Sequence, residues 1–312
     1  MSAPYVLVPI TLTDAMVSSS TAAEPAAGET AWNAATSYTV GQECYLAATH
    51  RIYTNLVAGV NATSPELALT GTTPRWKDTR ATNKWAMFDP RSNAQTALVT
   101  PLTVVLRPGI FNAIALYGLD GTALSVSVKD APGGTVIYTY ASDLTEPPVD
   151  HWDYYFGRIK AVSKILCRGI NIYADPEVTL SITAGVGVTV KCGMAALGDL
   201  RPLVNTEAVG GTQFGASAKP VTYSYVTTDA AGISSVTRRT RATDMEIRVM
   251  MPQTDTDSAL AALQDVLDVP AAWIGSDADG FAGLNTFGLA SSSVSYDGPG
   301  HSVAAIQVQG LM

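Results

Sequence analysis

The chain has 312 residues, of which 47% are hydrophobic and only 15% are charged, and its formal net charge is −8. This length predicts two or three domains. The acidic balance argues against duplex binding, which requires a basic patch. Arg238, Arg239 and Arg241 form the one basic cluster, which we interpret as a solvated strand end. The low charge density suggests that partners cover part of the surface.

The cysteines and the hydropathy of the chain indicate whether disulfides, a membrane span or a signal peptide are to be expected. Cys44, Cys167 and Cys192 are odd in number and scattered, so we expect core thiols and neither a disulfide framework nor a zinc knuckle. The chain has no apolar run of about 18 residues, and a membrane span is therefore not expected. The N-terminus lacks the basic region of a signal peptide, so we expect synthesis in the cytoplasm.

The first strand signal covers residues 5–12, and a stretch with linker composition follows at 18–30. Residues 31–78 are dense in aromatic side chains, with short strand-like pieces at 37–40, 43–47 and 51–55. We predict a small three-stranded module here. A core of this size is marginal, so packing of the aromatic rings is favoured over ligand binding, although both remain open. The rings in question are Trp32, Tyr38, Tyr45, Tyr53 and Trp76.

Strand signals are densest between residues 98 and 197. Leu124, Val126 and Val128 alternate with polar residues, which is the period of a half-buried strand. Glycine and proline turns separate the predicted strands, and no helix is expected. The pattern predicts a β-sandwich of the jelly-roll kind. The predicted strands are 102–106, 110–117, 124–128, 135–140, 154–159, 164–173, 178–183 and 186–194.

The C-terminal part is predicted to be β-rich with one helix. A loop at 198–220 leads into a hairpin of 221–227 and 234–241. Its part at 200–220 either reaches a neighbouring subunit or is a disordered linker. Apolar residues at helical spacing predict a helix at about 256–268. Further strands are predicted at 245–250, 272–275, 284–289, 291–296 and 303–308. The predicted domains are a sandwich at 1–30 and 79–199, the module at 31–78 and an assembly domain at 200–312.

Residues that could carry chemistry do not form a recognisable motif. His50, His151 and His301 are far apart in the sequence, and there is no Gly-x-Ser-x-Gly elbow. Asp150 and Asp153 flank Trp152 as in a sugar-hydrolysing pocket, but a pair of loop aspartates beside a packed tryptophan is the favoured reading. We therefore predict no catalytic residues, no metal and no cofactor.

Two glycine-containing segments resemble ligand loops only in part. The segment from Gly275 to Gly280 contains Asp277 and Asp279 but lacks the terminal glutamate of a calcium loop, so a turn is expected. Residues 185–187 are expected to form a turn between strands rather than a phosphate cradle.

The small module resembles chitin- and cellulose-binding-type modules. The resemblance rests on an opening tryptophan, a Tyr-x-x-Gly turn, a second strand, an x-Tyr strand and a closing tryptophan, at Trp32, Tyr38, Gly41, Tyr45, Tyr53 and Trp76. It implies that the five rings named above bind carbohydrate. Carbohydrate-binding members usually carry an exposed aromatic pair after the x-Tyr strand, whereas residues 55–61 of this chain contain no ring.

Landmarks along nearly the whole chain resemble tail-tip or baseplate proteins of long-tailed bacteriophages, including the distal-tail type. They lie at residues 82–89, 114–120, 152–156, 191–194, 212–217 and 306–311. The resemblance implies a galactose-binding-like jelly roll with the module inserted near its start. It also implies that the chain is a structural protein of the virion tail. Copies of the chain would form a homo-oligomeric ring and contact other tail proteins.

Three functions are thus under consideration. The first is a non-enzymatic assembly component of a tail tip. The second is an adhesion protein that binds host glycan through residues 32–78, and the third is a tail enzyme that uses Asp150 or Asp153. The sequence favours the first.

Overall fold

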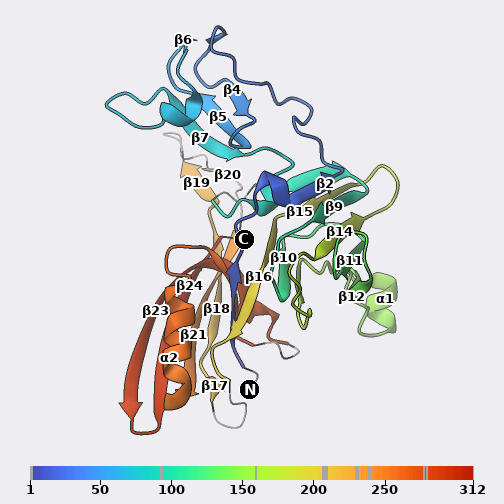
Figure 1. Ribbon diagram of the computed structural model, residues 1–312, viewed down its shortest axis with the longest axis vertical. Coiled ribbons are helices and arrows are strands. Elements are labelled where there is room, and N and C mark those ends of the chain that lie inside the picture. The colour runs from blue at the N-terminus through green and yellow to red at the C-terminus, as the bar shows by residue number, and fades with distance from the viewer. Residues whose placement is uncertain are drawn as a thin grey trace.

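The computed structural model describes residues 3–91, 94–158, 160–205, 210–228, 232, 234–237, 241–276, 278 and 280–311. The fold is mainly β and sandwich-like, as predicted from the sequence. The described residues contain two α-helices, α1 (His151–Phe156) and α2 (Gln253–Gln264). Figure 1 shows an elongated body with the small module at one end and the C-terminal strands with α2 at the other.

A curled antiparallel sheet of ten strands forms the centre of the molecule. Its order is β13-β10-β16-β1-β22-β23-β24-β21-β17, and β18 also pairs with β21. These strands are β1 (Tyr5–Pro9), β10 (Ala113–Tyr117), β13 (Lys164–Cys167), β16 (Met194–Pro202), β17 (Gly211–Thr212), β18 (Ser217–Thr222), β21 (Arg241–Pro252), β22 (Ala271–Ile274), β23 (Asn285–Gly298) and β24 (His301–Gly310).

Both faces of the middle strands of this sheet are buried. In β22, Ala271 and Trp273 pack in the cluster that includes α2, whereas Ala272 and Ile274 pack on the opposite face. Successive side chains of a strand point to opposite faces, so burial of both faces requires a continuous apolar run. The same reason explains why all five residues of β10 are buried.

The long sheet crosses the domain boundary that the sequence predicts at residue 200. That boundary falls inside β16, which pairs with β10 on one side and with β1 on the other. Strand β1 then pairs with β22. Residues 200–312 therefore share one sheet with the sandwich, because the N-terminal strand lies between the two parts.

Two glycines allow the sheet to curl tightly. Gly288 of β23 lies opposite Gly310 of β24, and a Cβ atom at either position would overlap the backbone of a neighbouring strand. Only glycine permits such a close approach of backbones.

A second sheet completes the sandwich, with the order β12-β11-β14-β9-β2. Val104, Val126 and Leu180 of this sheet pack in one core with Ile114 and Leu116 of β10. The short strands β8 (Thr96–Val99) and β15 (Thr189–Cys192) pair beside it. The strands of the second sheet are β2 (Val17–Ser20), β9 (Leu102–Leu106), β11 (Ala123–Lys129), β12 (Val136–Asp143) and β14 (Glu177–Thr183).

The small module has its own strands and its own core. Strands β4 (Glu43–Leu46), β5 (Arg51–Asn55) and β7 (Trp76–Ala81) form a three-stranded sheet. The sequence predicted strands at 43–47 and 51–55, but it placed the third at 37–40, whereas β7 takes that place in the sheet. The pair β3 (Ser37–Tyr38) and β6 (Gly59–Val60) lies beside it. Since β7 continues to Ala81, the module extends a few residues beyond its predicted end at 78.

Glu24 in the linker ties the module to the sandwich. Its carboxylate accepts hydrogen bonds from Thr82 Oγ1 at 2.7 Å and Trp85 Nε1 at 3.0 Å, and it lies 3.0 Å from His50 Nδ1. The His50 ring stacks on Trp85 with 4.4 Å between centroids. His50 holds a left-handed backbone conformation with a φ of 56°. These contacts join the β4–β5 turn and the segment after β7 to the linker.

Several elements differ from the sequence prediction. Residues 154–159 were predicted as a strand, but 151–156 form helix α1. The predicted loop at 198–220 contains the end of β16, β17 and the start of β18. The strands predicted at 284–289 and 291–296 are one strand, β23. Helix α2 is confirmed, but it begins and ends a few residues earlier than predicted.

Candidate interaction surfaces

Three of the five aromatic residues predicted to bind carbohydrate form the core of the small module. Tyr38, Tyr53 and Trp76 are each at most 2% exposed. Tyr38 packs edge-on against Trp76 with 5.1 Å between ring centroids, and its hydroxyl accepts a hydrogen bond from Asn33 N. A stacked sugar needs an open ring face. These three rings therefore pack, and they offer no platform for a ligand.

Trp32 and Tyr45 are the two remaining predicted rings, and both are half-buried. They lie on neighbouring backbone segments, since Trp32 N donates to Tyr45 O at 2.9 Å. The stretch 55–61, which contains no aromatic ring, is held by hydrogen bonds of its asparagine side chains. Asn61 Nδ2 donates to Asn55 Oδ1 at 2.6 Å, and Arg75 donates to Asn61 Oδ1. The module thus gathers its rings inward rather than on an exposed face.

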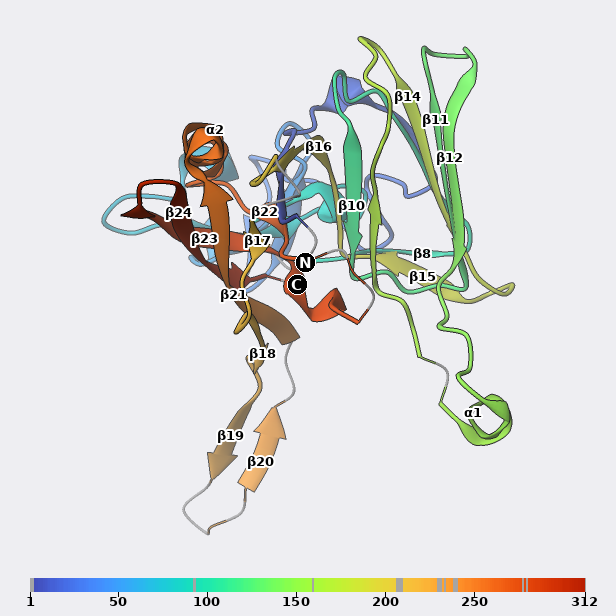
Figure 2. The same cartoon turned by 90° about the horizontal axis from the view of Figure 1, so that it is seen from below.

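The most exposed aromatic cluster lies elsewhere, on a loop that we name the aromatic loop (145–158, 160 and 161). Its neck is closed by the pairing of Thr145 with Ala161 and by a 2.8 Å bond from Glu146 N to Lys160 O. Helix α1 lies at its tip, and Figure 2 shows α1 hanging away from the sandwich. Four rings on α1 are each about 70% exposed: Trp152, Tyr154, Tyr155 and Phe156.

The aspartates of the aromatic loop hold its helix in place. Asp150 Oδ1 accepts from Asp153 N at 2.7 Å, and Asp153 Oδ2 accepts from Val149 N at 3.1 Å. The first bond is an N-cap, which satisfies a free N–H group at the helix start, and the second fixes the residue that precedes the cap. Both carboxylates are engaged in these hydrogen bonds. The sequence favoured loop aspartates beside a packed tryptophan, but the two aspartates lie at the start of a helix and Trp152 is 71% exposed.

Position 157, where helix α1 ends, requires glycine for a steric reason. Gly157 N donates to Asp153 O at 2.8 Å, and a Cβ atom at position 157 would overlap Asp153. Aromatic residues favour strands by propensity, and the sequence therefore predicted one here. The signal that could have identified the helix is Asp150 with Asp153, three residues apart and preceded by two prolines.

A second projection is a hairpin that we name the arm, formed by β19 (Tyr225–Thr228) and β20 (Ser234–Thr237). It continues outward from the pair β18–β21, and all eight of its strand residues are exposed. Val226 and Val236 lie directly opposite each other and are 62% and 64% exposed. Figure 2 shows the arm extending from the body toward the same side as α1.

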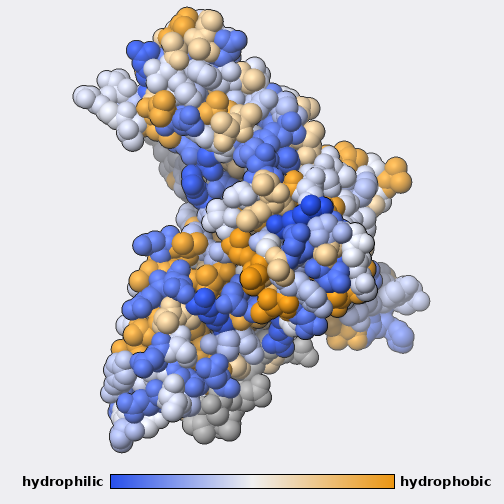
Figure 3. All heavy atoms as spheres, viewed as in Figure 1, coloured by the Kyte–Doolittle hydropathy of each residue, from blue (hydrophilic) through white to orange (hydrophobic). Residues whose placement is uncertain are grey.

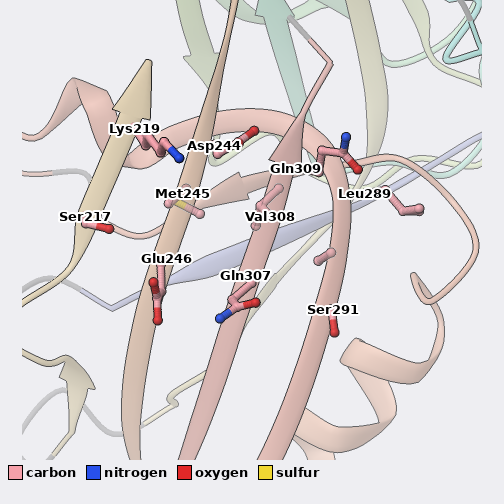
Figure 4. Close-up of a pocket in the computed structure, with 11 residues that line it drawn as sticks. Ser217, Lys219, Asp244, Met245, Glu246, Leu289, Ser291, Gln307, Val308 and Gln309 are labelled. Carbon is pink, nitrogen blue, oxygen red and sulfur yellow. The ribbon is translucent and has the colours of Figure 1, made fainter. Parts of the chain in front are cut away.

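The open face of the C-terminal strands forms a wide, shallow hollow of about 550 Å³. One row of side chains crosses four strands here, in the order Ser217, Glu246, Gln307 and Ser291. Figure 4 shows Glu246 and Gln307 side by side on neighbouring strands. Such a polar face opposite an apolar one is the usual state of an antiparallel sheet. It offers hydrogen-bonding groups but no convergent cleft.

Apolar surface is also open in two further places. Phe214, which is 93% exposed, and Phe281 line a hollow of about 320 Å³ beside β17 and β18. Figure 3 shows hydrophobic residues gathered in the middle of the molecule, where Figure 1 places β10 and β16. Polar residues surround this patch on the face shown.

The three cysteines are buried and free. Burial raises the pKa of Cys44 and of Cys167 to about 11, and that of Cys192 to about 12. The thiolate is the reactive form, so a thiol held protonated is inert. These cysteines are core residues, as their sequence environment suggested.

We expect the native protein to resist alkylation by iodoacetamide at about pH 8, close to the ordinary pKa of a free thiol. After denaturation all three cysteines should react, because the unfolded chain no longer holds them protonated. Intact-mass spectrometry counts the labels in the native and denatured samples. Rapid labelling of any cysteine in the native sample would contradict the burial described.

The three histidines lie on different elements of the fold. His50 is part of the Glu24 contacts, whereas His151 lies on α1 and His301 at the start of β24. Among the residues that the structure describes, no group of three or more histidine, cysteine or acidic side chains could hold a metal ion. Asp277, Asp279, Arg238 and Arg239 lie outside the described residues.

Comparison with protein-family models, with curated proteins and with solved structures found no match. None of the helices in the described part of the chain is long and apolar enough to cross a membrane.

Proposed function

We propose that the chain is a structural subunit of a phage tail tip, which assembles with copies of itself and with neighbouring tail proteins. The tail assignment rests on the sequence landmarks given above. The observation that supports assembly is the arm, a two-stranded hairpin that extends from the body and whose eight described strand residues are all exposed.

The physical argument starts from the weakness of such a hairpin. A two-stranded hairpin alone is marginally stable in water, and its open edges present unpaired backbone groups. Val226 and Val236 add a pair of apolar side chains that water surrounds on the free chain. A neighbouring subunit that covers this pair would satisfy the unpaired backbone groups and remove the two valines from water. The arm is therefore suited to reach into an adjacent copy.

A structural role is also consistent with the state of the reactive side chains. Asp150 and Asp153 are engaged in hydrogen bonds at the start of α1. The thiols of Cys44, Cys167 and Cys192 are held protonated. We therefore propose an assembly component rather than an enzyme.

The arm can be tested with a charge placed on one of its faces. We expect Val226→Glu to lower self-association of the full chain by at least tenfold, since it would bury an unpaired carboxylate in the interface. Sedimentation velocity over a range of concentrations measures the association. Thr227→Glu is the matched control, because the adjacent side chain points to the opposite face of the hairpin.

The tail assignment has its own test. Antibodies against the chain should label the tail tip of purified particles in electron microscopy. A chain that remains monomeric at every concentration and is absent from purified particles would overturn the proposal.

A further inference from the structure

We propose that the aromatic loop is a binding site for a neutral carbohydrate. The aromatic rings stack against the sugar, and the hollow beside them supplies the polar groups. This site is separate from residues 32–78 and does not depend on the assembly role. It is argued from the exposure, order and surroundings of the rings on α1.

The first argument is the size of the exposed aromatic surface. Trp152, Tyr154, Tyr155 and Phe156 are each about 70% exposed. With roughly 150–250 Å² for each ring, they leave on the order of 500 Å² open to water. Patches of this size on a folded chain are often functional.

The second argument is that the rings are ordered by one another and by their helix. Trp152 and Phe156 are four residues apart and lie on one helix face with 4.5 Å between centroids. Tyr154 and Tyr155 pack edge to face at 5.1 Å. Because the aspartate cap and the closed neck hold α1, less ordering entropy is lost when a ligand binds.

The third argument is the hollow beside the rings. It has a volume of about 450 Å³, within the usual range for small-ligand sites, and Tyr154 forms part of its wall. Glu146 supplies an acceptor here, and Arg158 and Lys160 supply donors. Neither of these cations, nor Glu146, makes an ion pair with another described residue.

This combination fits a saccharide better than a lipid surface or an apolar protein pocket. A pyranose offers a C–H face to a ring and hydroxyl groups to mixed donors and acceptors. The loop carries Glu146, Asp150 and Asp153 against Arg158 and Lys160, so its net charge is negative and anionic lipid would repel it. An apolar pocket would desolvate the same charges without pairing them.

The test uses Trp152 as its own reporter. The other four tryptophans are buried or half-buried, so iodide should quench chiefly Trp152. The full chain is titrated with neutral oligosaccharides of glucose, galactose, rhamnose and N-acetylglucosamine. We expect at least one of them to protect Trp152 from iodide with saturating dependence, and the same sugar to be retained in equilibrium dialysis.

Variants separate the site from the rest of the molecule. In dialysis, Trp152→Ala and Tyr154→Ala should each weaken retention of that sugar roughly tenfold, the change that about 1.4 kcal/mol of lost contact makes. Phe214→Ala removes an even more exposed ring elsewhere and should leave sugar retention unchanged. These exposed residues can be replaced without unfolding the body.

Three results would overturn the proposal. The first is that none of the oligosaccharides protects Trp152. The second is that Trp152→Ala retains sugar as well as the unaltered chain does. The third is that phosphatidylcholine vesicles, or a second copy of the chain, cover Trp152 while sugars do not. None of these readouts measures self-association through the arm, so failure here leaves the proposed function to its own test.

Discussion

Replacing Phe287 with alanine is expected to lower the free energy of unfolding by about 3–5 kcal/mol, and to do so for both halves of the long sheet together. Phe287 is fully buried and packs against Tyr117 with 5.8 Å between ring centroids. Tyr117 belongs to β10 and Phe287 to β23, so this contact joins residues that the sequence assigned to separate domains.

Polar contacts reinforce the same junction. Tyr117 Oη donates to Asn285 Oδ1 at 2.6 Å, and Lys164 Nζ donates to Asn285 O at 2.7 Å. Burial lowers the pKa of Lys164 and raises that of Tyr117. A cavity at position 287 would therefore loosen contacts of Tyr117, Lys164 and Asn285 on both sides of the junction.

Urea unfolding monitored by hydrogen exchange measures this coupling. In Phe287→Ala, protection should fall together in β10 and β23. Leu289→Ala, on the same strand but 41% exposed, is the control and should change the stability by no more than about 0.5 kcal/mol. If β23 alone lost protection while β10 kept it, the two parts would be independent and the continuous core would be wrong.

Trp76→Ala is expected to unfold the small module while the body stays folded. Trp76 is 1% exposed and packs against Tyr38 at the centre of the module core. Loss of a buried tryptophan costs about 3–5 kcal/mol, which is as much as a core of this size can supply. The body keeps its own core clusters, which share no residue with that of the module.

Limited proteolysis with mass spectrometry distinguishes local from global unfolding here. Cleavage that is absent from the unaltered chain should concentrate between residues 31 and 81, with no new cleavage in the strands of the body. Trp32→Ala, at a half-buried ring, should have a smaller effect on the same sites. The description of the module as a separate core would fail if cleavage spread through the whole chain, or if the module stayed protected.

Much of the strand pattern could be predicted from local sequence. Strands β5 and β9 have the bounds that their patterns predict, and β11 shows the alternation of Leu124, Val126 and Val128 toward the core. These features depend on side-chain period and on neighbouring turn residues, which are local properties. The single long helix was predictable for the same reason.

The aromatic residues illustrate why the candidate sites could not be predicted in the same way. Trp76 and Trp152 are both tryptophans in polar surroundings, yet one is buried and the other is 71% exposed. Which ring faces water depends on segments far away in sequence, such as the partner strand β5 for Trp76. The capped helix that carries Trp152 was hidden by the strand propensity of its own rings.

The sequence by itself determined the mainly β character, the aromatic module near the N-terminus and the position of helix α2. Only the tertiary structure decided that β1 joins the sandwich to the C-terminal strands, and that the arm and the aromatic loop project to one side. Strand pairing between residues distant in the chain depends on which apolar faces can be buried together. That choice is made by the whole folded chain, and no local pattern contains it.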